Sequence, residues 1–218
     1  MSWAALTSGG KDSILAVQRA IDAGMEVTHL VTVRPANVES FMFHTSNLDA
    51  VPVIARLSGM EYVEIPSGGS KEEEVIDLEE GLSSLSVEGI ITGAIASRYQ
   101  LERIRKVADH LSLAVHSPLW GEDPVALLRE VSDRLHAILV VVAADGLTSR
   151  YLGRRIDRDL IGELQDLAVK RGIHISGEGG EYETLTLNAP FYCRPLTYRS
   201  SELISSMRRS ELILRGFE

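Results

Sequence analysis

The chain has 218 residues, 44% of them hydrophobic, and a formal net charge of −9 at pH 7. This length predicts one large domain or two small ones, and the apolar share supports a full hydrophobic core. The negative charge disfavours a stable nucleic-acid partner, which would need Lys and Arg contacts to phosphates, and the single cysteine excludes an internal disulfide, a Cys-x-x-Cys redox pair and a cysteine-rich zinc site.

The N-terminal residues 1–8 lack the charged n-region and the long apolar h-region of a signal peptide. They hold instead a short apolar run at residues 3–6, which is typical of a buried strand. No apolar run in the chain approaches the ~20 residues of a membrane span. We therefore expect a cytoplasmic protein without a membrane partner.

The sequence Ser-Gly-Gly-Lys-Asp-Ser follows that first run and precedes a helical pattern in which Ile14, Val17 and Ile21 share a face and Gly24 ends the helix. The glycines allow the backbone to approach an anion closely, and the N–H groups that open the helix favour negative charge. The pattern therefore predicts a phosphate-binding loop. Its residues are Ser8, Gly9, Gly10, Lys11, Asp12 and Ser13, of which Lys11 and Asp12 are also candidates for the chemistry.

This loop is not a Walker A loop, because Ala5 and Asp12 stand where that pattern requires glycine and Ser or Thr. It resembles the signature Ser-Gly-Gly-x-Asp-Ser of the PP-loop ATP pyrophosphatases. That resemblance implies cleavage of ATP to AMP and pyrophosphate, with the loop holding the pyrophosphate. The plainer alternative is a glycine turn that begins an ordinary helix; the six-residue match after a first strand favours the functional interpretation.

Strands and helices alternate along the first half of the chain. Strands are expected near residues 3–6, 26–33, 62–65, 89–93 and 113–115, and helices near residues 11–23, 47–58, 71–85 and 101–111. Connections of this length between strands predict a doubly wound parallel α/β sheet. Ligands of such sheets bind beyond the carboxyl ends of the strands, so we expect the nucleotide there. The backbone groups assigned to it, besides the loop, belong to the strand end at Val31–Val33, with Val33 itself, and to Gly93, Ala94 and Ile95.

The second half changes character. We expect a helix at residues 124–135, a doubly buried apolar strand at 137–142, a helix at 159–171 that Gly172 ends, and a strand at 183–187. We place the boundary between an ATP-binding domain at residues 1–118 and a smaller α/β domain at residues 119–218.

Residues 177–183 combine three glycines with three carboxylates, which folding alone explains poorly because glycines weaken an element and like charges repel. If a strand follows, Glu181 and Glu183 project on one face with Leu185 and Leu187. A carboxylate on an apolar face needs a cation, an amine or a hydrogen-bond donor. The alternative, a charged glycine hairpin in solvent, stays open at this point.

Together these stretches resemble the diphthine–ammonia ligase family, a branch of the PP-loop ATPases, over nearly the whole chain. The resemblance implies a PP-loop fold of the HUP-like, adenine nucleotide alpha hydrolase-like type. It rests on residues 8–13, 43–45, 93–95, 118–120, 143–147, 152–154 and 177–184, with Tyr99, Gln100 and Arg103.

Membership implies amidation of diphthine, a modified histidine on translation elongation factor 2, to diphthamide in an archaeal-type cytoplasm. ATP and ammonium would be consumed through an acyl-adenylate, with Mg²⁺ near Asp12. Glu181 is our first choice to bind the ammonium and take its proton, beside Glu183 and Glu178. The candidate substrate contacts are His44, Tyr99, Gln100, Arg103, Gly179, Gly180 and Tyr182.

Two alternatives of different classes remain. Another PP-loop enzyme could modify a small-molecule acid or a tRNA, although the lone Cys193 disfavours thiolation. A non-catalytic ATP-binding sensor would keep the phosphate loop but has no use for Glu178, Glu181 and Glu183. The oligomeric state is also open, a homodimer included.

Overall fold

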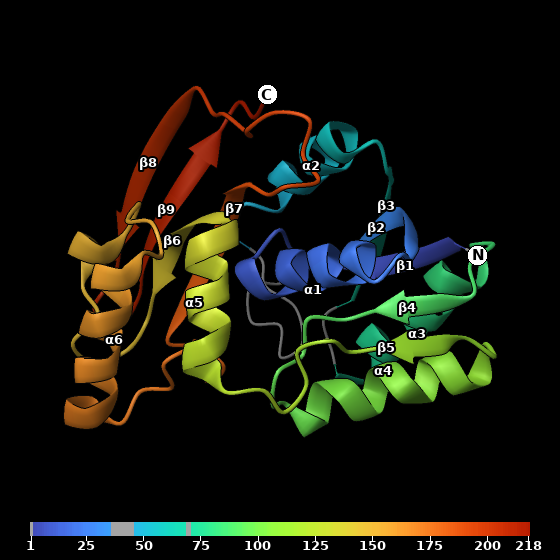
Figure 1. The fold of residues 1–218 in the computed structure, drawn as a ribbon, viewed down its shortest axis with the longest axis horizontal. Helices are drawn as coiled ribbons and strands as arrows, with labels where there is room; N and C mark the ends of the chain where they lie inside the picture. Colours follow the sequence, from blue (N-terminus) through green and yellow to red (C-terminus); the bar gives the residue numbers. More distant parts are fainter. Residues whose placement is uncertain (1, 36–45, 69–70) are drawn as a thin grey trace.

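The computed structural model describes residues 2–35, 46–68 and 71–218. The predicted substrate residue His44 and the stretch at residues 43–45 lie outside the described residues. Seen in Figure 1, the molecule consists of a parallel sheet with helices and, beside it, a second sheet that carries two further helices.

The first sheet has five parallel strands in the order β3-β2-β1-β4-β5, which confirms the doubly wound α/β prediction. The order reverses between β1 and β4, so the loops after these two strands diverge and leave space for a ligand. The strands are β1 (Ser2–Leu6), β2 (Glu26–Pro35), β3 (Glu61–Ser67), β4 (Gly89–Ile91) and β5 (Ala114–His116).

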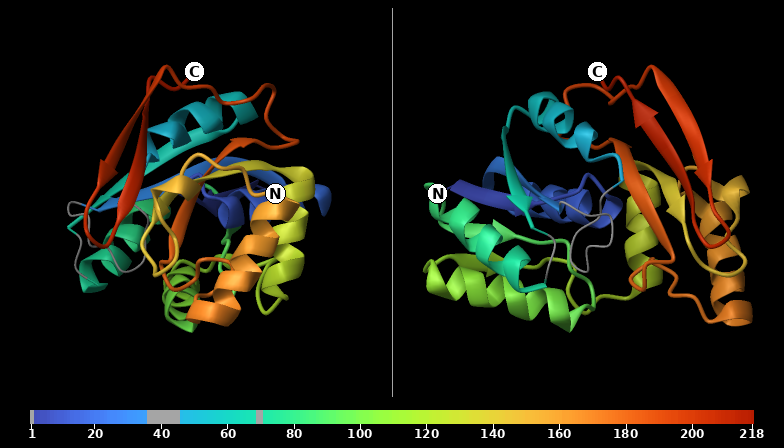
Figure 2. Two further views of the ribbon diagram at one scale, coloured as in Figure 1. Left: turned by 90° about the vertical axis from the view of Figure 1, so that its left-hand side faces the viewer. Right: turned by 180° about the vertical axis from the view of Figure 1, so that it is seen from behind.

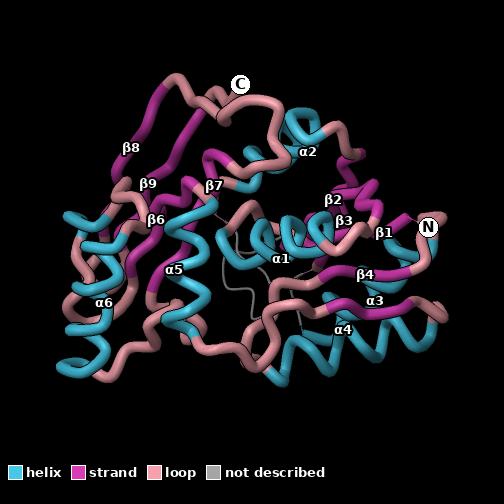
Figure 3. Tube along the Cα trace, in the orientation of Figure 1, coloured by secondary structure: helices cyan, strands magenta, loops and turns pink. Residues whose placement is uncertain are grey.

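Helices cover both faces of this sheet (Figures 1 and 3). On one face, Ala5 of β1 joins a core with α1 and α2; on the other, Ala4 and Leu6 join a core with α3 and α4. Because successive side chains of β1 point to opposite faces of the sheet, this strand contributes to both apolar cores. The helices are α1 (Lys11–Asp22), α2 (Val51–Ser58), which follows the short helix η1 (Leu48–Ala50), α3 (Lys71–Ser83) and α4 (Arg98–His110).

The second sheet is antiparallel, with strand order β7-β6-β9-β8. All residues of β6 after His136 are buried, as the continuous apolar run predicts. The elements of this half are α5 (Pro124–Arg134), β6 (His136–Val142), the short helix η2 (Ser149–Tyr151), α6 (Arg158–Arg171), β7 (Tyr182–Asn188), β8 (Ser200–Ser205) and β9 (Ser210–Arg215).

The β8–β9 hairpin is absent from the sequence-based expectations. Every residue of β8 is exposed, so its sequence carries no buried apolar run that would mark a strand. The strand exists because it pairs with β9 along its whole length. Figures 1 and 2 show the hairpin at the end of the molecule opposite the N-terminus.

Helix ends in this half follow local chemistry. The side chain of Asp123 accepts a hydrogen bond from the N–H of Ala126 at the start of α5, and Asp157 does the same for Leu160 at the start of α6. Gly172 ends α6 in the left-handed conformation, at φ 71°, where a residue with a Cβ would be strained. No helix of the described residues is long and apolar enough to cross a membrane.

The second half packs at the carboxyl ends of β1 and β4. One apolar cluster combines Ile14 and Ile54 of the first half with Leu128 and Leu185 of the second. The N–H of Thr186 in β7 donates to the carbonyl of Gly9 at 2.9 Å. Strand β7 therefore lies directly against the predicted phosphate loop, which places residues 177–184 next to it.

Candidate active site

The loop at residues 8–13 turns sharply out of β1 into α1. Gly9 has a φ of 79°, and Gly10 is the extended residue that precedes the helix. The hydroxyl of Thr7 accepts from the N–H of Gly9 at 2.9 Å and lies 2.7 Å from the hydroxyl of Ser13. The loop is thus fixed by partners within a few residues, with the first N–H groups of α1 at its mouth.

Lys11 joins this loop to the second half. Its ammonium donates to Asp12 and to the carbonyl of Ser176, both at 2.7 Å, and lies 5.2 Å from the centre of the Tyr182 ring. Its backbone N–H donates to the hydroxyl of Thr184 at 3.0 Å. The side chain is only 4% exposed. A buried cation with these partners stays oriented, so its charge faces the loop without costly rearrangement.

The loop after β4 closes the other side. A Cβ on Gly93 would lie 2.6 Å from the backbone nitrogen of Ser13, so only glycine allows this loop to pack on the first turn of α1. Beyond it, the N–H of Ala96 donates to Glu178 at 3.3 Å. The loop after β4 therefore contacts both the phosphate loop and residues 177–184.

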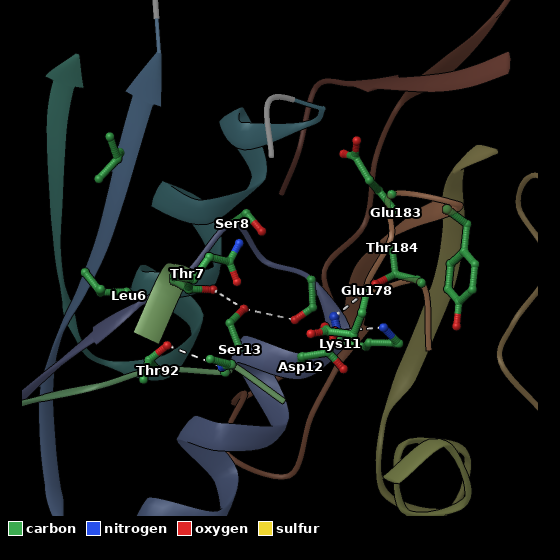
Figure 4. A pocket seen from close by; sticks show the side chains of 18 of the residues that line it. Leu6, Thr7, Ser8, Lys11, Asp12, Ser13, Thr92, Glu178, Glu183 and Thr184 are labelled. Atoms are coloured by element: carbon green, nitrogen blue, oxygen red, sulfur yellow. Dashed lines mark hydrogen bonds and ion pairs between the residues drawn. The ribbon is translucent and has the colours of Figure 1, made fainter. Parts of the chain in front are cut away.

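The three glutamates within residues 177–184 lie in different environments. Burial raises the pKa of the Glu178 carboxyl, and the neighbouring charge of Asp12 raises this pKa further. Glu183, whose side chain is 12% exposed, pairs with Arg209 at 3.2 Å. In Figure 4 Glu178 lies beside Lys11 and Asp12, whereas the carboxylate of Glu183 points away from them.

The carboxylate of Glu181 is already committed to the backbone. It accepts from the N–H of His174 at 2.7 Å and from the N–H of Gly179 at 2.8 Å. It precedes β7 and lies outside the lining of the cavity. The structure thus gives Glu181 the task of shaping the loop, and its catalytic role stays a prediction that this geometry does not favour.

These elements enclose a cavity of about 490 Å³, large enough for a nucleotide. Most of the predicted site residues line it. They are Ser8, Gly10, Lys11, Asp12, Ser13, Val33, Gly93, Ala94, Gln100, Glu178, Gly179, Gly180, Tyr182 and Glu183.

Other predicted residues lie outside the lining. Gly9 shapes the turn behind the loop, and Ile95 is buried in the core. The guanidinium of Arg103 stacks on the ring of Tyr99 at 3.5 Å, which makes these two a pair on α4. The structure therefore does not bring Tyr99, Arg103 and Ile95 to the cavity wall.

Sequence reasoning missed several lining residues. Thr7 and Thr92 follow β1 and β4 directly, and the rule that ligands bind at strand ends could have identified both. Gly177 and Thr184 belong to the second stretch. No pattern pointed to Arg209, which reaches the cavity from the β8–β9 turn. The additional lining residues are Leu6, Thr7, Thr92, Ile104, Gly177, Thr184 and Arg209, and Val31 lines the cavity at the strand end that the sequence assigned to the nucleotide.

A magnesium ion fits the chemistry of this wall. Among the described residues, no cluster of three or more His, Cys, Asp or Glu forms a site made of protein groups alone. Asp12 and Glu178, however, lie close enough together for the charge of Asp12 to raise the pKa of the Glu178 carboxyl. Mg²⁺ is commonly held by one or two carboxylates together with phosphate oxygens, which is what this pair offers beside a phosphate loop.

The likeness to solved structures concerns the fold. A structure described as a predicted subunit of tRNA methyltransferase from Methanocaldococcus jannaschii aligns with a TM-score of 0.50 and 15% identity. The alignment covers 87% of this chain and 98% of that one. At this identity the similarity shows a shared architecture alone.

Sequence comparisons are more specific. Residues 1–115 match the model of the diphthamide synthase N-terminal domain, and residues 123–211 match the C-terminal domain. The chain is 35% identical to the diphthine–ammonia ligase of Danio rerio, over 91% of this chain and 87% of that protein. It is 35% identical to the Homo sapiens enzyme, over 94% and 85%. The chain therefore belongs to the diphthine–ammonia ligase family.

Proposed function

We propose that this chain is a diphthine–ammonia ligase that converts the carboxylate of diphthine on translation elongation factor 2 to the amide. In the first step a carboxylate oxygen attacks the α-phosphorus of ATP, and pyrophosphate leaves. In the second step ammonia attacks the acyl carbon, AMP leaves with the carboxylate oxygen, and one proton is released. The sum is acid, ATP and ammonia to amide, AMP and pyrophosphate.

One observation carries this proposal: the phosphate loop and the carboxylate stretch share one cavity and are tied together by Lys11. A carboxylate resists ammonia until its oxygen becomes part of a good leaving group, and the phosphate loop supports that activation. Ammonium must also be held and deprotonated, which needs a carboxylate. Both requirements meet here, and a site that only bound ATP would need just the first.

Each group then has a task. The ammonium of Lys11 and the N–H groups of residues 8–13, apart from those of Gly9 and Lys11, stabilise the charge that develops on pyrophosphate. Asp12 and Glu178 would hold Mg²⁺, which when bound offsets phosphate charge. Glu183, whose carboxylate points away from Lys11 and Asp12, would bind ammonium and accept its proton.

The test uses the full chain with diphthine-bearing elongation factor 2, ATP and Mg²⁺, with and without ammonium. We expect pyrophosphate in both mixtures, and the amide, detected by mass spectrometry, only with ammonium. Omitting the protein substrate should abolish most pyrophosphate release. ATP binding without pyrophosphate in any mixture would point to a sensor. Pyrophosphate release only with a small-molecule acid or a tRNA would redirect the assignment to another substrate.

A further inference from the structure

Among the described residues that line the cavity, Arg209 is the charged one that the mechanism above does not use. It ends the turn of the β8–β9 hairpin, where the N–H of Ser206 donates to its carbonyl at 2.7 Å and its own N–H donates to the Ser206 hydroxyl at 3.2 Å. Its backbone is therefore fixed. Its side chain is 39% exposed and lines the cavity.

The cavity has few cations for an acidic substrate. Among the described residues that line it, the Lys and Arg side chains are those of Lys11 and Arg209. The ammonium of Lys11 is buried and already donates to Asp12 and to a carbonyl. Arg209 is thus the cation that remains accessible to an incoming carboxylate.

The guanidinium of Arg209 has donors to spare. It carries five N–H donors, and the described residues show one hydrogen bond from it, from Nη2 to Glu183 at 3.2 Å. The carboxylate of Glu211 lies 3.8 Å from Nε. The remaining donors can form the paired bonds that an Arg fork makes with a carboxylate.

We propose that Arg209 binds the carboxylate of the acid substrate and positions it for activation, an inference that rests on the function proposed above. In phosphoryl-group chemistry the attacking and leaving oxygens lie roughly in line, so the acid must approach from the side away from the phosphate loop. Glu183, the partner of Arg209, points away from Lys11 and Asp12, as Figure 4 shows.

The position of Arg209 also suits an acid carried by a protein. It lies at the cavity rim, next to a hairpin turn in which Met207 is fully exposed. A side chain of another protein can therefore reach the guanidinium without entering deeply. Glu183 at its side places the ammonium-binding carboxylate next to the acyl carbon that ammonia must attack.

The negative charge of Glu183 gives the proposal a second consequence. This carboxylate orients the guanidinium but also repels a substrate carboxylate bound to it. Glu183→Gln should therefore leave binding of the acid unchanged or tighten it, while the amide-forming step slows. If the Arg209–Glu183 pair only stabilised the structure, either substitution would weaken the site in the same way. Glu183→Gln would then weaken binding of the acid.

The experiment compares Arg209→Gln, Arg209→Lys and the matched control Arg208→Gln, since Arg208 is exposed on the same turn and does not line the cavity. Affinities are measured for ATP, for elongation factor 2 carrying diphthine, and for the same protein carrying the amide product. KM and kcat for pyrophosphate release complete the set. The acid and the amide differ at the group that Arg209 is proposed to bind.

We expect Arg209→Gln to raise KM for the acid-bearing protein by roughly 10–100-fold, the worth of hydrogen bonds to a charged group. ATP affinity should change by less than about twofold, within surface-substitution effects. The wild type should prefer acid over amide, Arg209→Gln should lose that preference, and Arg209→Lys should keep part of it. Arg208→Gln should behave as wild type.

Equal discrimination between acid and amide in wild type and Arg209→Gln would overturn the role of Arg209 while leaving the proposed function intact. Equal losses in Arg208→Gln and Arg209→Gln would do the same, because the effect would then belong to the hairpin. A wild-type protein that releases no pyrophosphate with the acid-bearing protein would instead refute the proposed function and this inference with it.

Discussion

The phosphate loop at residues 8–13 and the carboxylate stretch at residues 177–184 line the same cavity but are held in different ways. The loop is fixed by short-range bonds, such as those that link Thr7 to Gly9 and Ser13 to Gly10. Glu178 depends on the N–H of Ala96, and Glu183 on Arg209, both far away in the sequence. The turn of the phosphate loop is therefore shaped largely by local bonds, although Gly9 and Lys11 also bond to distant residues, and the chemical half is assembled by the fold.

Three hydrogen bonds among the described residues join these halves, one of them from the N–H of Thr186 to the carbonyl of Gly9. Lys11 donates its backbone N–H to Thr184 and its ammonium to the carbonyl of Ser176. Changes at these atoms should affect both halves, whereas changes at Glu183 should affect the chemistry alone. This difference can be tested by substitutions that separate the two, and the largest expected effect belongs to Glu183.

Glu183→Gln should slow amide formation by about 10²–10⁴-fold, the usual worth of a general base. Pyrophosphate release should persist, because the phosphate loop is untouched. The matched control is Glu181→Gln, which keeps the loop shape less well but removes no cavity carboxylate. Single-turnover assays that follow amide and pyrophosphate separately measure both. A larger amidation defect in the Glu181 variant than in the Glu183 variant would reverse their roles.

Lys11→Met should slow pyrophosphate release by roughly 10²–10³-fold, as expected when one stabiliser of developing charge is removed. The effect should include ATP binding, because Lys11 belongs to the phosphate loop. Lys170→Met is the control, since Lys170 is exposed on α6 and pairs there with Asp166, four residues earlier, at 3.5 Å. Titration calorimetry and pyrophosphate assays check the pair. Normal pyrophosphate release by Lys11→Met would remove the cation from the activation step.

Thr184→Val should destabilise the protein by roughly 1–3 kcal/mol, because the buried N–H of Lys11 would lose its acceptor. ATP affinity should fall with it, since this bond couples β7 to the phosphate loop. Thr148→Val on an exposed turn is the control. Denaturant unfolding gives the free energies. An unchanged stability and affinity would show that the two halves are not coupled through this hydroxyl.

The smallest of the expected effects on stability is that of Glu178→Gln, and it depends on pH. Burial and the charge of Asp12 raise the pKa of Glu178 in the folded protein above the value of about 4.5 expected when unfolded. The folded state therefore binds its proton more tightly, and ionisation costs stability as pH rises through this interval.

Relative to wild type, Glu178→Gln should be more stable at pH 7, and the difference should shrink as pH falls through the raised pKa of folded Glu178 and be lost below about 4.5. Thermal unfolding at a series of pH values measures it, with the exposed Glu102→Gln as control. A difference of opposite sign at pH 7 would mean that a cation, and not burial, dominates the environment of Glu178.

Much of the molecule is determined by the sequence itself. The alternation of strands and helices predicts the parallel sheet, and Gly172 marks the end of α6 correctly. The turn at residues 8–13 is recognisable because its bonds close within a few residues, so its residue types are set by local geometry. Local geometry does not decide in the same way whether the glycine- and carboxylate-rich residues 177–184 belong to a site or form a hairpin in solvent.

Only the tertiary structure decided where the other charges lie. Glu181 turns to two backbone N–H groups, although strand alternation had placed it with Glu183. Strand β8 has no buried face of its own and exists through pairing with β9, so its sequence shows no strand pattern. Arg209 enters the cavity on that hairpin. Such positions depend on partners far along the chain, and a sequence pattern records short-range geometry and burial, not which distant groups the fold brings together.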